Sequence, residues 1–260
     1  MRLQGKVVLI TGASEGIGAA CAAAFRACGA RVSVTARSAE KLAAAAGPDG
    51  LATPGDITDA DVRRTVVART VERFGGVDVL LNNAGRGLYH PAWQASAEDA
   101  ERLFSLNFFA PLDMVRLVVP HMRQRGGGTI VNVASIAGRV TLPWMTLYSA
   151  SKYALSSVTD GLRMELAGTG IHTITVCPGY VKTGFHTNAQ GEPPTRIAGG
   201  KRFAITAEEC ARAIVRGVER DARTVMAPRS GWLLVALARL APRLVDRRLV
   251  AIGQSIWTSD

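Results

Sequence analysis

The sequence predicts an α/β fold in which helices cover both faces of one parallel, doubly wound sheet of seven strands. Short apolar runs rich in Val and Ile alternate along the chain with longer helical patterns, as in repeated strand–helix–strand units. No internal repeat or linker interrupts this alternation. With 260 residues and 48% hydrophobic content, the chain can bury a sizeable core within a single domain.

Each predicted element is a run that fits one of these two patterns. The strands are predicted at residues 7–10, 31–35, 51–54, 77–82, 128–134, 172–177 and 223–226. The helices include residues 16–28, 59–74, 97–125, 148–167 and 207–220. Asp59 and Thr206 stand at the start of two helices, where a short polar side chain caps free N–H groups.

Two segments depart from the alternation. Residues 182–205 form a long polar loop with several Gly and Pro residues, and loops of this length are commonly functional. Residues 229–260 begin with an amphipathic apolar stretch that Arg239, Pro242 and Arg243 interrupt well short of the ~20 residues of a membrane span. We therefore predict a main domain at residues 1–228, with 182–205 as its substrate loop, and a C-terminal helical extension.

The composition narrows the functional classes. The net charge of +10 is compatible with a nucleic-acid partner, an anionic lipid surface or an acidic substrate. No basic run is interleaved with aromatic residues, so we expect no nucleic-acid partner. The four cysteines form no CxxC pair, so we expect neither disulfides nor a metal site. The N-terminus enters an apolar strand at Val7 without room for a signal peptide, which favours a cytoplasmic protein.

Three glycines cluster where the first strand is predicted to turn into the first helix, in Thr11-Gly12-Ala13-Ser14-Glu15-Gly16-Ile17-Gly18. A backbone without side chains can approach a pyrophosphate closely, and the N-terminus of the following helix offers free N–H groups and a favourable dipole. A tight turn without a ligand would use the same glycines, but the strand–turn–helix setting favours a phosphate site. The sheet is therefore predicted to be of the Rossmann type.

The spacing TGxxxGIG resembles that of the short-chain dehydrogenase/reductase family, and the resemblance extends from about Lys6 to Met226. Asp56, in Gly-Asp-Ile-Thr, follows the third predicted strand, and Asn82-Asn83-Ala84-Gly85 follows the fourth, both where the family places such segments. The resemblance implies that Asp56 contacts the adenine and that the NNAG turn supports the sheet beside the cofactor. Each segment alone could be an ordinary turn.

The end of the second strand, Thr35-Ala36-Arg37-Ser38, bears on the choice between NAD and NADP. A carboxylate there would accept from a free ribose 2′-hydroxyl but repel a 2′-phosphate. This segment has no carboxylate, and the Arg37 guanidinium can hold phosphate by two hydrogen bonds, with Ser38 and Lys41 nearby. We expect NADP(H), although Glu15 stands in the glycine turn where some NADP-preferring relatives have a basic residue.

A second set of residues supplies the groups that carbonyl reduction needs. Tyr148 and Lys152 are one helical turn apart, so both side chains project from one face. An ammonium near the phenol, together with the positive charge of an oxidised nicotinamide, is expected to lower the tyrosine pKa. Ser135 precedes Tyr148 at the family's serine-to-tyrosine separation. The resemblance implies that Ser135 donates to the substrate oxygen and that Asn107 holds a water that relays protons toward Lys152.

The segment Pro178-Gly179-Tyr180-Val181-Lys182-Thr183 resembles the family's PGxVxT segment, in which Val181 and Thr183 would anchor the carboxamide of the nicotinamide. Ser135, Tyr148, Lys152 and Asn107 are thus the expected catalytic residues. The residues expected to bind the cofactor are Gly12, Ser14, Glu15, Gly16, Ile17, Gly18, Arg37, Ser38, Asp56, Ile57, Asn83, Ala84, Gly85, Tyr148, Lys152, Pro178, Gly179, Val181 and Thr183.

The sequence therefore predicts an oxidoreductase that transfers a hydride between C4 of NADP(H) and a carbonyl or secondary alcohol. The segments around Tyr148 and through PGYVKTGF resemble the hydroxysteroid- and retinol-type branch, which implies a bulky apolar ketone as the small-molecule substrate. Near the expected entrance lie Leu142, Pro143, Trp144, Phe185 and the loop through Phe203. These residues either select the substrate or only pack as a lid.

Two other functions are open. A 3-oxoacyl thioester reductase would suit the basic surface, because an acyl-carrier protein is acidic, with Arg123 and Arg125 for docking or simply as cations at a helix C-terminus. A non-catalytic NADP-binding sensor or scaffold is disfavoured by the complete catalytic set.

The resemblance also implies a homodimer or homotetramer built from the Asn107-bearing helix and the Tyr148 helix. The apolar stripe after Arg229 could lie on anionic lipid. Such a stripe more often covers the protein's own substrate loop or a second subunit, so membrane contact is the less favoured alternative.

Overall fold

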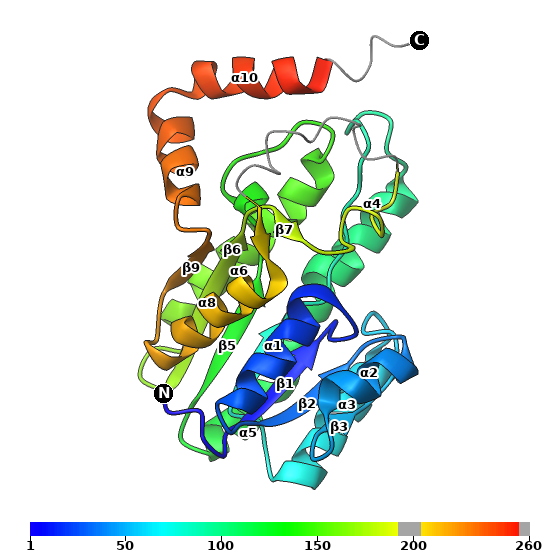
Figure 1. Cartoon of the computed structure of the whole chain (residues 1–260), viewed down its shortest axis with the longest axis vertical. Coiled ribbons are helices and arrows are strands. Elements are labelled where there is room, and N and C mark those ends of the chain that lie inside the picture. The colour runs from blue at the N-terminus through cyan, green and yellow to red at the C-terminus, as the bar shows by residue number, and fades with distance from the viewer. Residues whose placement is uncertain (192–203, 255–260) are drawn as a thin grey trace.

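The computed structural model describes residues 1–191 and 204–254, and its centre is a wholly parallel seven-stranded sheet (Figure 1). The strand order is β3–β2–β1–β4–β5–β6–β9. The predicted doubly wound sheet is confirmed. The strands are β1 Val7–Thr11, β2 Arg31–Thr35, β3 Leu51–Ala52, β4 Val79–Asn82, β5 Gly128–Val133, β6 Ile171–Pro178 and β9 Thr224–Ala227.

Two helices begin at the capping side chains that the sequence predicts. Asp59 accepts from the N–H of Asp61, and Thr206 forms a reciprocal capping box with Glu209, so both predicted N-caps are confirmed. A short strand pair, β7 Val181–Lys182 and β8 Ile205–Thr206, lies outside the main sheet. The helices of the main body are α1 Gly16–Ala27, α2 Ala39–Ala46, α3 Ala60–Phe74, α4 Ala97–Phe104, α5 Ala110–Gln124, α6 Thr146–Glu165 and α8 Ala207–Glu219.

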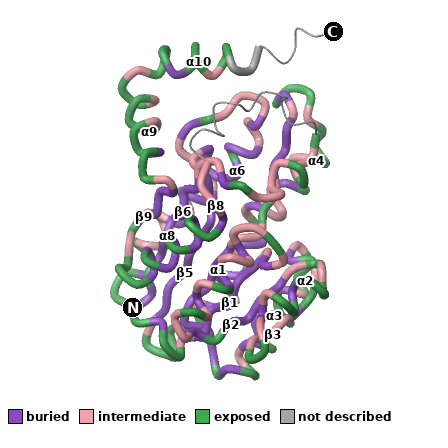
Figure 2. The backbone as a smooth tube through the Cα atoms, in the orientation of Figure 1, coloured by how far each residue is buried: buried purple, intermediate pink, exposed green. Residues whose placement is uncertain are grey.

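The core lies on both faces of the sheet, which is buried along its length (Figure 2). Successive side chains of a strand point to opposite faces, so Val8 and Ile10 of β1 join one apolar cluster while Leu9 joins the other. The first cluster packs under α1 and α8, and the second under α3 and α5. Near-continuous apolar strands are the expected consequence of this double burial.

Several elements differ from the sequence prediction. The helix predicted at residues 97–125 is continuous but contains a π-helical turn, Ser105–Phe109, between α4 and α5. The third strand stops at Ala52 instead of residue 54, and α2 was not among the predicted helices. By length and composition Ala97–Gln124 could cross a membrane, but α5 packs on the sheet and on α3.

The C-terminal extension consists of two helices, α9 Gly231–Leu240 and α10 Pro242–Gln254, with the direction changing at Ala241 (Figure 1). The missing N–H of Pro242 suits the first position of a new helix and not the interior of an old one. Val235 and Val245 are buried against Val140, Cys177 and Met226, so the extension is anchored to the main body beside β9.

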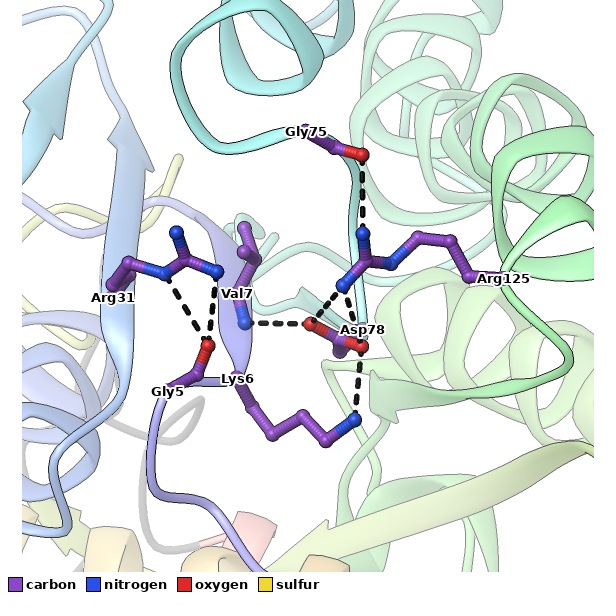
Figure 3. A network of polar contacts seen from close by, with 7 residues as sticks. All are labelled: Gly5, Lys6, Val7, Arg31, Gly75, Asp78 and Arg125. Atoms are coloured by element: carbon purple, nitrogen blue, oxygen red, sulfur yellow. Dashed lines mark hydrogen bonds and ion pairs between the residues drawn. The ribbon is translucent and has the colours of Figure 1, made fainter.

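A buried carboxylate ties together the amino-terminal ends of β1 and β4 (Figure 3). Asp78 accepts from the N–H of Val7 at 2.8 Å, from Lys6 Nζ at 3.2 Å and from Arg125 at 3.3 Å. Arg125 also donates to the carbonyl of Gly75 at 3.1 Å. Burial alone would raise the pKa of Asp78, but the Val7 hydrogen bond and the two cations outweigh burial and lower it.

Asp78→Asn is expected to lower the free energy of unfolding by about 2–3 kcal/mol at neutral pH, because charged hydrogen bonds are lost in a buried site. The folded-state pKa lies below the unfolded one, so this stability is present above the ordinary aspartate pKa and is lost as pH falls through the folded value. Urea unfolding at neutral pH and near pH ~2 should show the gap between wild type and variant narrowing in acid.

The matched control is Asp61→Asn, which removes an exposed partner of Arg64. It should change the free energy of unfolding by less than about 0.5 kcal/mol. An Asp78 variant as stable as the wild type at neutral pH would show that the network does not stabilise the sheet.

Candidate active site

A cavity of about 1890 Å³ opens at the carboxyl ends of the central strands. It lies where the strand order reverses. The chain goes from β1 to β2 on one side of β1, and β4 lies on the other side. Open α/β sheets bind ligands in the crevice at this reversal. The volume exceeds the roughly 300–1,000 Å³ of a site for a drug-sized ligand, so a dinucleotide and a substrate can be held together.

The glycine turn after β1 forms one wall of the cavity and fits a pyrophosphate. Gly12 and Gly16 have positive φ, and a Cβ on Gly18 would lie 2.2 Å from the carbonyl oxygen of Gly12. Glu15, at the N-cap of α1, makes no capping hydrogen bond with its side chain. The first N–H groups of α1 are thus without a side-chain cap at the cavity wall, where a helix N-terminus attracts an anion.

The NNAG turn after β4 holds the glycine turn in place. Asn83 Nδ2 donates to the carbonyls of Thr11 at 3.0 Å and Gly12 at 2.9 Å. The N–H groups of Asn83 and Ala84 donate to the Thr11 hydroxyl, each at 3.1 Å. A Cβ on Gly12 would come within 2.7 Å of Ala84 Cα. The two turns therefore pack at a distance that only glycine permits.

The far end of the cavity is lined by residues at the ends of β2 and β3. Arg37 has no ion pair within the described part of the chain, and the Ser38 side chain makes no capping bond although it begins α2. Lys41 lies 3.5 Å from Glu15, so the carboxylate in the glycine turn is paired. This end can hold a phosphate with Arg37 and the Ser38 hydroxyl.

Asp56 and Ile57 line the same end. The Asp56 carboxylate accepts from the Thr58 N–H at 2.9 Å and from its hydroxyl at 2.8 Å. Burial alone would raise the pKa of Asp56, but these hydrogen bonds and the nearby charges of Arg37 and Arg86 lower it. The carboxylate is therefore ionised and oriented.

Ser135, Tyr148 and Lys152 meet at the centre of the cavity. Ser135 follows β5 and begins a single 3₁₀ turn, and Tyr148 and Lys152 are buried on one face of α6. Burial raises the pKa of the Tyr148 phenol, and the Ser135 hydroxyl acts on the phenol to lower it. Lys152 Nζ donates to the Val133 carbonyl at 2.9 Å and lies 5.9 Å from the centre of the Tyr148 ring.

The pKa of Tyr148 differs from the value expected from the sequence. Burial raises the pKa of Tyr148 to about 12, opposed by the hydrogen bond from Ser135, and burial lowers the pKa of Lys152 to about 8. The expected lowering of the tyrosine pKa by Lys152 is therefore wrong for the protein alone. That expectation also relied on the charge of an oxidised nicotinamide, which is not part of the protein.

Asn107 lies behind the cavity wall, in the π-helical turn. Its Oδ1 accepts from the Arg86 N–H at 3.0 Å, and its Nδ2 donates to the Arg86 carbonyl at 3.0 Å and to Ser151 at 3.1 Å. A Cβ on Gly85 would lie 3.1 Å from Asn107 Oδ1 and 3.2 Å from Lys152 Nζ. π-Helical turns such as Ser105–Phe109 are frequent at functional sites. The water relay stays a prediction, since Asn107, like Gly18, does not line the cavity itself.

The remaining predicted cofactor residues come together at the same cavity. Thr183 packs against the glycine turn, with its Cγ2 3.2 Å from the position of a Cβ on Gly16. The other residues of both predicted sets that line the cavity are Ser14, Ile17, Asn83, Ala84, Gly85, Pro178, Gly179 and Val181.

Phe185 was expected near the entrance, but its aromatic neighbours Tyr89 and His186 in the same cavity were not predicted. The Tyr89 hydroxyl is hydrogen bonded to His186, whose ring stacks on Tyr180 with centres 4.6 Å apart, and Phe185 lies 5.5 Å from Tyr148. These residues come from loops after β4 and β6 and form no local motif. Of the predicted substrate loop, residues 192–203, including Phe203, lie outside the described residues.

The C-terminal helices also reach the cavity. Their contribution is mostly aliphatic: Leu233, Leu234, Leu237, Leu244, Val245, Arg248 and Leu249. The amphipathic pattern of this segment was visible in the sequence, but its place in the lining of this cavity depends on the fold.

Comparison with known proteins decides the family. Residues 6–193 match the model of the short chain dehydrogenase family. The chain belongs to the short-chain dehydrogenase/reductase family. It is 34% identical over 259 residues to the ketoacyl reductase HetN of a Nostoc species, covering 94% of this chain and 88% of that protein.

Two solved short-chain dehydrogenase/reductases from Burkholderia have the same fold. The B. phymatum protein, in complex with NAD, matches with a TM-score of 0.83 and 26% identity over 94% of this chain and 96% of its own. The B. cenocepacia protein, in complex with NADP, matches with a TM-score of 0.81 and 30% identity. The match covers 96% of this chain and 99% of that protein. The predicted family is thus confirmed, and with it an oxidoreductase of carbonyl or alcohol groups that binds a nicotinamide cofactor.

Lys152→Met is expected to raise the free energy of unfolding at pH ~7 by up to about 3 kcal/mol, because it removes a buried ammonium. The folded-state pKa of about 8 lies below the ordinary lysine value, so the destabilisation is complete below pH 8 and disappears as pH rises from there to about 10.5. Thermal unfolding at pH ~7 and ~9.5 should show a gain that shrinks at the higher pH.

The control, Lys182→Met, removes an exposed lysine and should give no gain at either pH. A gain for Lys152→Met that is the same at both pH values would mean that the buried lysine is not the titrating group.

Proposed function

We propose that this short-chain dehydrogenase/reductase uses NADP(H) to interconvert a bulky apolar ketone and its secondary alcohol. The observation that carries the proposal is the convergence of Ser135, Tyr148 and Lys152 in one cavity with the glycine turn. The cofactor, when bound, supplies or accepts the hydride; the protein supplies orientation and proton transfer.

Tyr148 is the proposed acid in the direction of reduction. Its raised pKa keeps the phenol protonated at neutral pH, so it can donate to the carbonyl oxygen as negative charge develops there. Ser135 lines the same cavity as the phenol and can donate to the same oxygen. Lys152 then stabilises the phenolate, and its position depends on the Val133 carbonyl. In alcohol oxidation the same groups act in reverse.

The preference for NADP(H) rests on the residues at the end of β2. Arg37 and Ser38 line the cavity, Arg37 forms no ion pair within the described chain, and the segment Thr35-Ala36-Arg37-Ser38 has no carboxylate. The pairing of Glu15 with Lys41 reduces the repulsion that Glu15 would exert on a 2′-phosphate. Because one solved relative holds NAD and the other NADP, the choice is argued from this chain alone.

The substrate class is argued from the cavity beyond Tyr148. Leu142, Trp144, Phe185 and the leucines of α9 and α10 give this half an apolar lining, which suits a bulky hydrophobic ketone. A 3-oxoacyl thioester is the second candidate, because the relative HetN is named a ketoacyl reductase.

The proposal includes a cytoplasmic location and a homodimer or homotetramer. The assembly would cover large apolar side chains that are 41–74% exposed on the π-helical turn and on α6: Phe109, Tyr153 and Met164.

Tyr148→Phe tests the reaction. The wild type should oxidise NADPH with one or more ketones of a panel of steroid, aromatic, aliphatic and 3-oxoacyl substrates, measured by NADPH absorbance. The variant should lose roughly 10²–10⁴-fold in kcat, because the acid is removed, and should still bind NADPH. Tyr153→Phe, on the same helix but outside the cavity lining, should keep full activity. Binding of NADPH without turnover of any ketone would favour the non-catalytic sensor.

Arg37→Glu tests the cofactor preference. It should lower kcat/KM for NADPH by about tenfold or more, through loss of a charged hydrogen bond to the 2′-phosphate, and leave NADH equal or improved. Steady-state kinetics with both cofactors at a saturating ketone measure the change. Arg69→Glu, which makes the same charge change at an exposed site on α3, is the control. Equal losses for NADPH and NADH would refute the assigned role.

A further inference from the structure

The turn that precedes the Tyr148 helix holds a residue that the backbone disfavours. The N–H of Met145 donates to the Leu142 carbonyl at 3.2 Å and closes a β-turn with Pro143 and Trp144 in its centre. Trp144 has φ +60°. A turn with Pro second and positive φ third is of type II, and its third position normally holds Gly or Asn. A bulky side chain with φ in this region is strained.

The surrounding structure fixes this backbone independently of the Trp144 side chain. The N–H of His90 donates to the Trp144 carbonyl at 2.8 Å, and the N–H of Leu142 donates to the Ser149 hydroxyl at 3.2 Å. Met145 is buried in the apolar cluster that includes Tyr148. Glycine could therefore occupy position 144 in the same turn and with less strain.

Core packing does not account for the tryptophan. Within the residues that the structure describes, Trp144 belongs to none of the four apolar clusters and stacks on no aromatic ring. It is only partly buried and lines the cavity together with Ser135 and Tyr148. Strained residues persist where the surroundings hold them, and they gather at ligand sites.

We infer that Trp144 is a specificity-determining residue whose indole packs on a planar ring substituent of the ketone. This inference rests on the proposed function. The aromatic residues Tyr89, Tyr180 and Phe185 line the same cavity, so a flat ring can stack on rigid flat side chains there. A linear acyl chain gains less from such walls, so the inference selects aryl and polycyclic ketones over 3-oxoacyl chains.

Trp144→Gly tests the inference with two readouts that a structural role would not move together. Removing the strained side chain should raise Tm, by about 2–4 °C, whereas deleting a packed tryptophan would lower it. The preference for 2-acetylnaphthalene over 2-dodecanone, which has the same number of carbon atoms, should fall roughly tenfold in kcat/KM. NADPH affinity should stay unchanged.

Two variants serve as controls. Trp144→Phe keeps a ring and the strain, so it should keep part of the preference and show no gain in Tm. Trp93→Gly makes the same deletion at a tryptophan that is 82% exposed and outside the cavity lining, so it should leave the preference unchanged and should not raise Tm.

Binding of both ketones by calorimetry in the NADPH-loaded Tyr148→Phe protein separates this inference from the proposed function. The inference is supported if the protein prefers to bind the planar ketone and Trp144→Gly abolishes this preference. This holds even if the wild type reduces neither ketone, because a lack of reduction would refute only the proposed function. A lower Tm, an unchanged preference, or failure of the planar ketone to bind would each overturn the inference.

Discussion

The reversal of strand order between β1 and β4 is the constraint on which the rest of this structure depends. Parallel strands all end at the same edge, and the chain leaves β1 and β4 toward opposite sides, so a crevice opens between their carboxyl ends. The hydrogen bonds from Asn83 to Thr11 and Gly12 hold the two sides of this crevice together at its base. β5 and β6 end at the same edge, and the segments that follow them bring Ser135, Val181 and Thr183 to the cavity.

The site carries structural features that cost stability. Lys152 is buried with its pKa lowered, Asn107 lies in a π-helical turn, and Trp144 has the φ of a glycine. At each of these three positions another residue or another backbone conformation would be more stable. These three residues lie in one part of the fold, near Tyr148. Such grouping is expected where the residues that a reaction needs are not those that would make the fold most stable.

The sequence predicted the parts of this structure that local patterns encode. Strands buried on both faces appear as runs of Val and Ile, so the ends of all seven strands were placed to within two residues. Both β3 and β4 proved two residues shorter than predicted. The turn residues of the glycine and NNAG motifs act through their own backbone and could be located by spacing. The π-helical turn was not predictable, because its apolar periodicity is that of an ordinary helix. Tyr89 and His186 were missed since their pairing joins loops far apart in the chain.

The amphipathic stripe of the C-terminal extension shows why exposure alone does not identify an interface. One set of its apolar residues, including Val235 and Val245, is buried against the main body. Leu233, Leu237 and Leu244 are 41–75% exposed, yet all three line the cavity that contains Tyr148. Apolar side chains in a binding cavity must stay accessible to the ligand, so their exposure is accounted for without a lipid surface or a second subunit. Trp232, 45% exposed, and Leu240, 85% exposed, also belong to α9 but lie outside the cavity lining, so a ligand in the cavity does not account for their exposure.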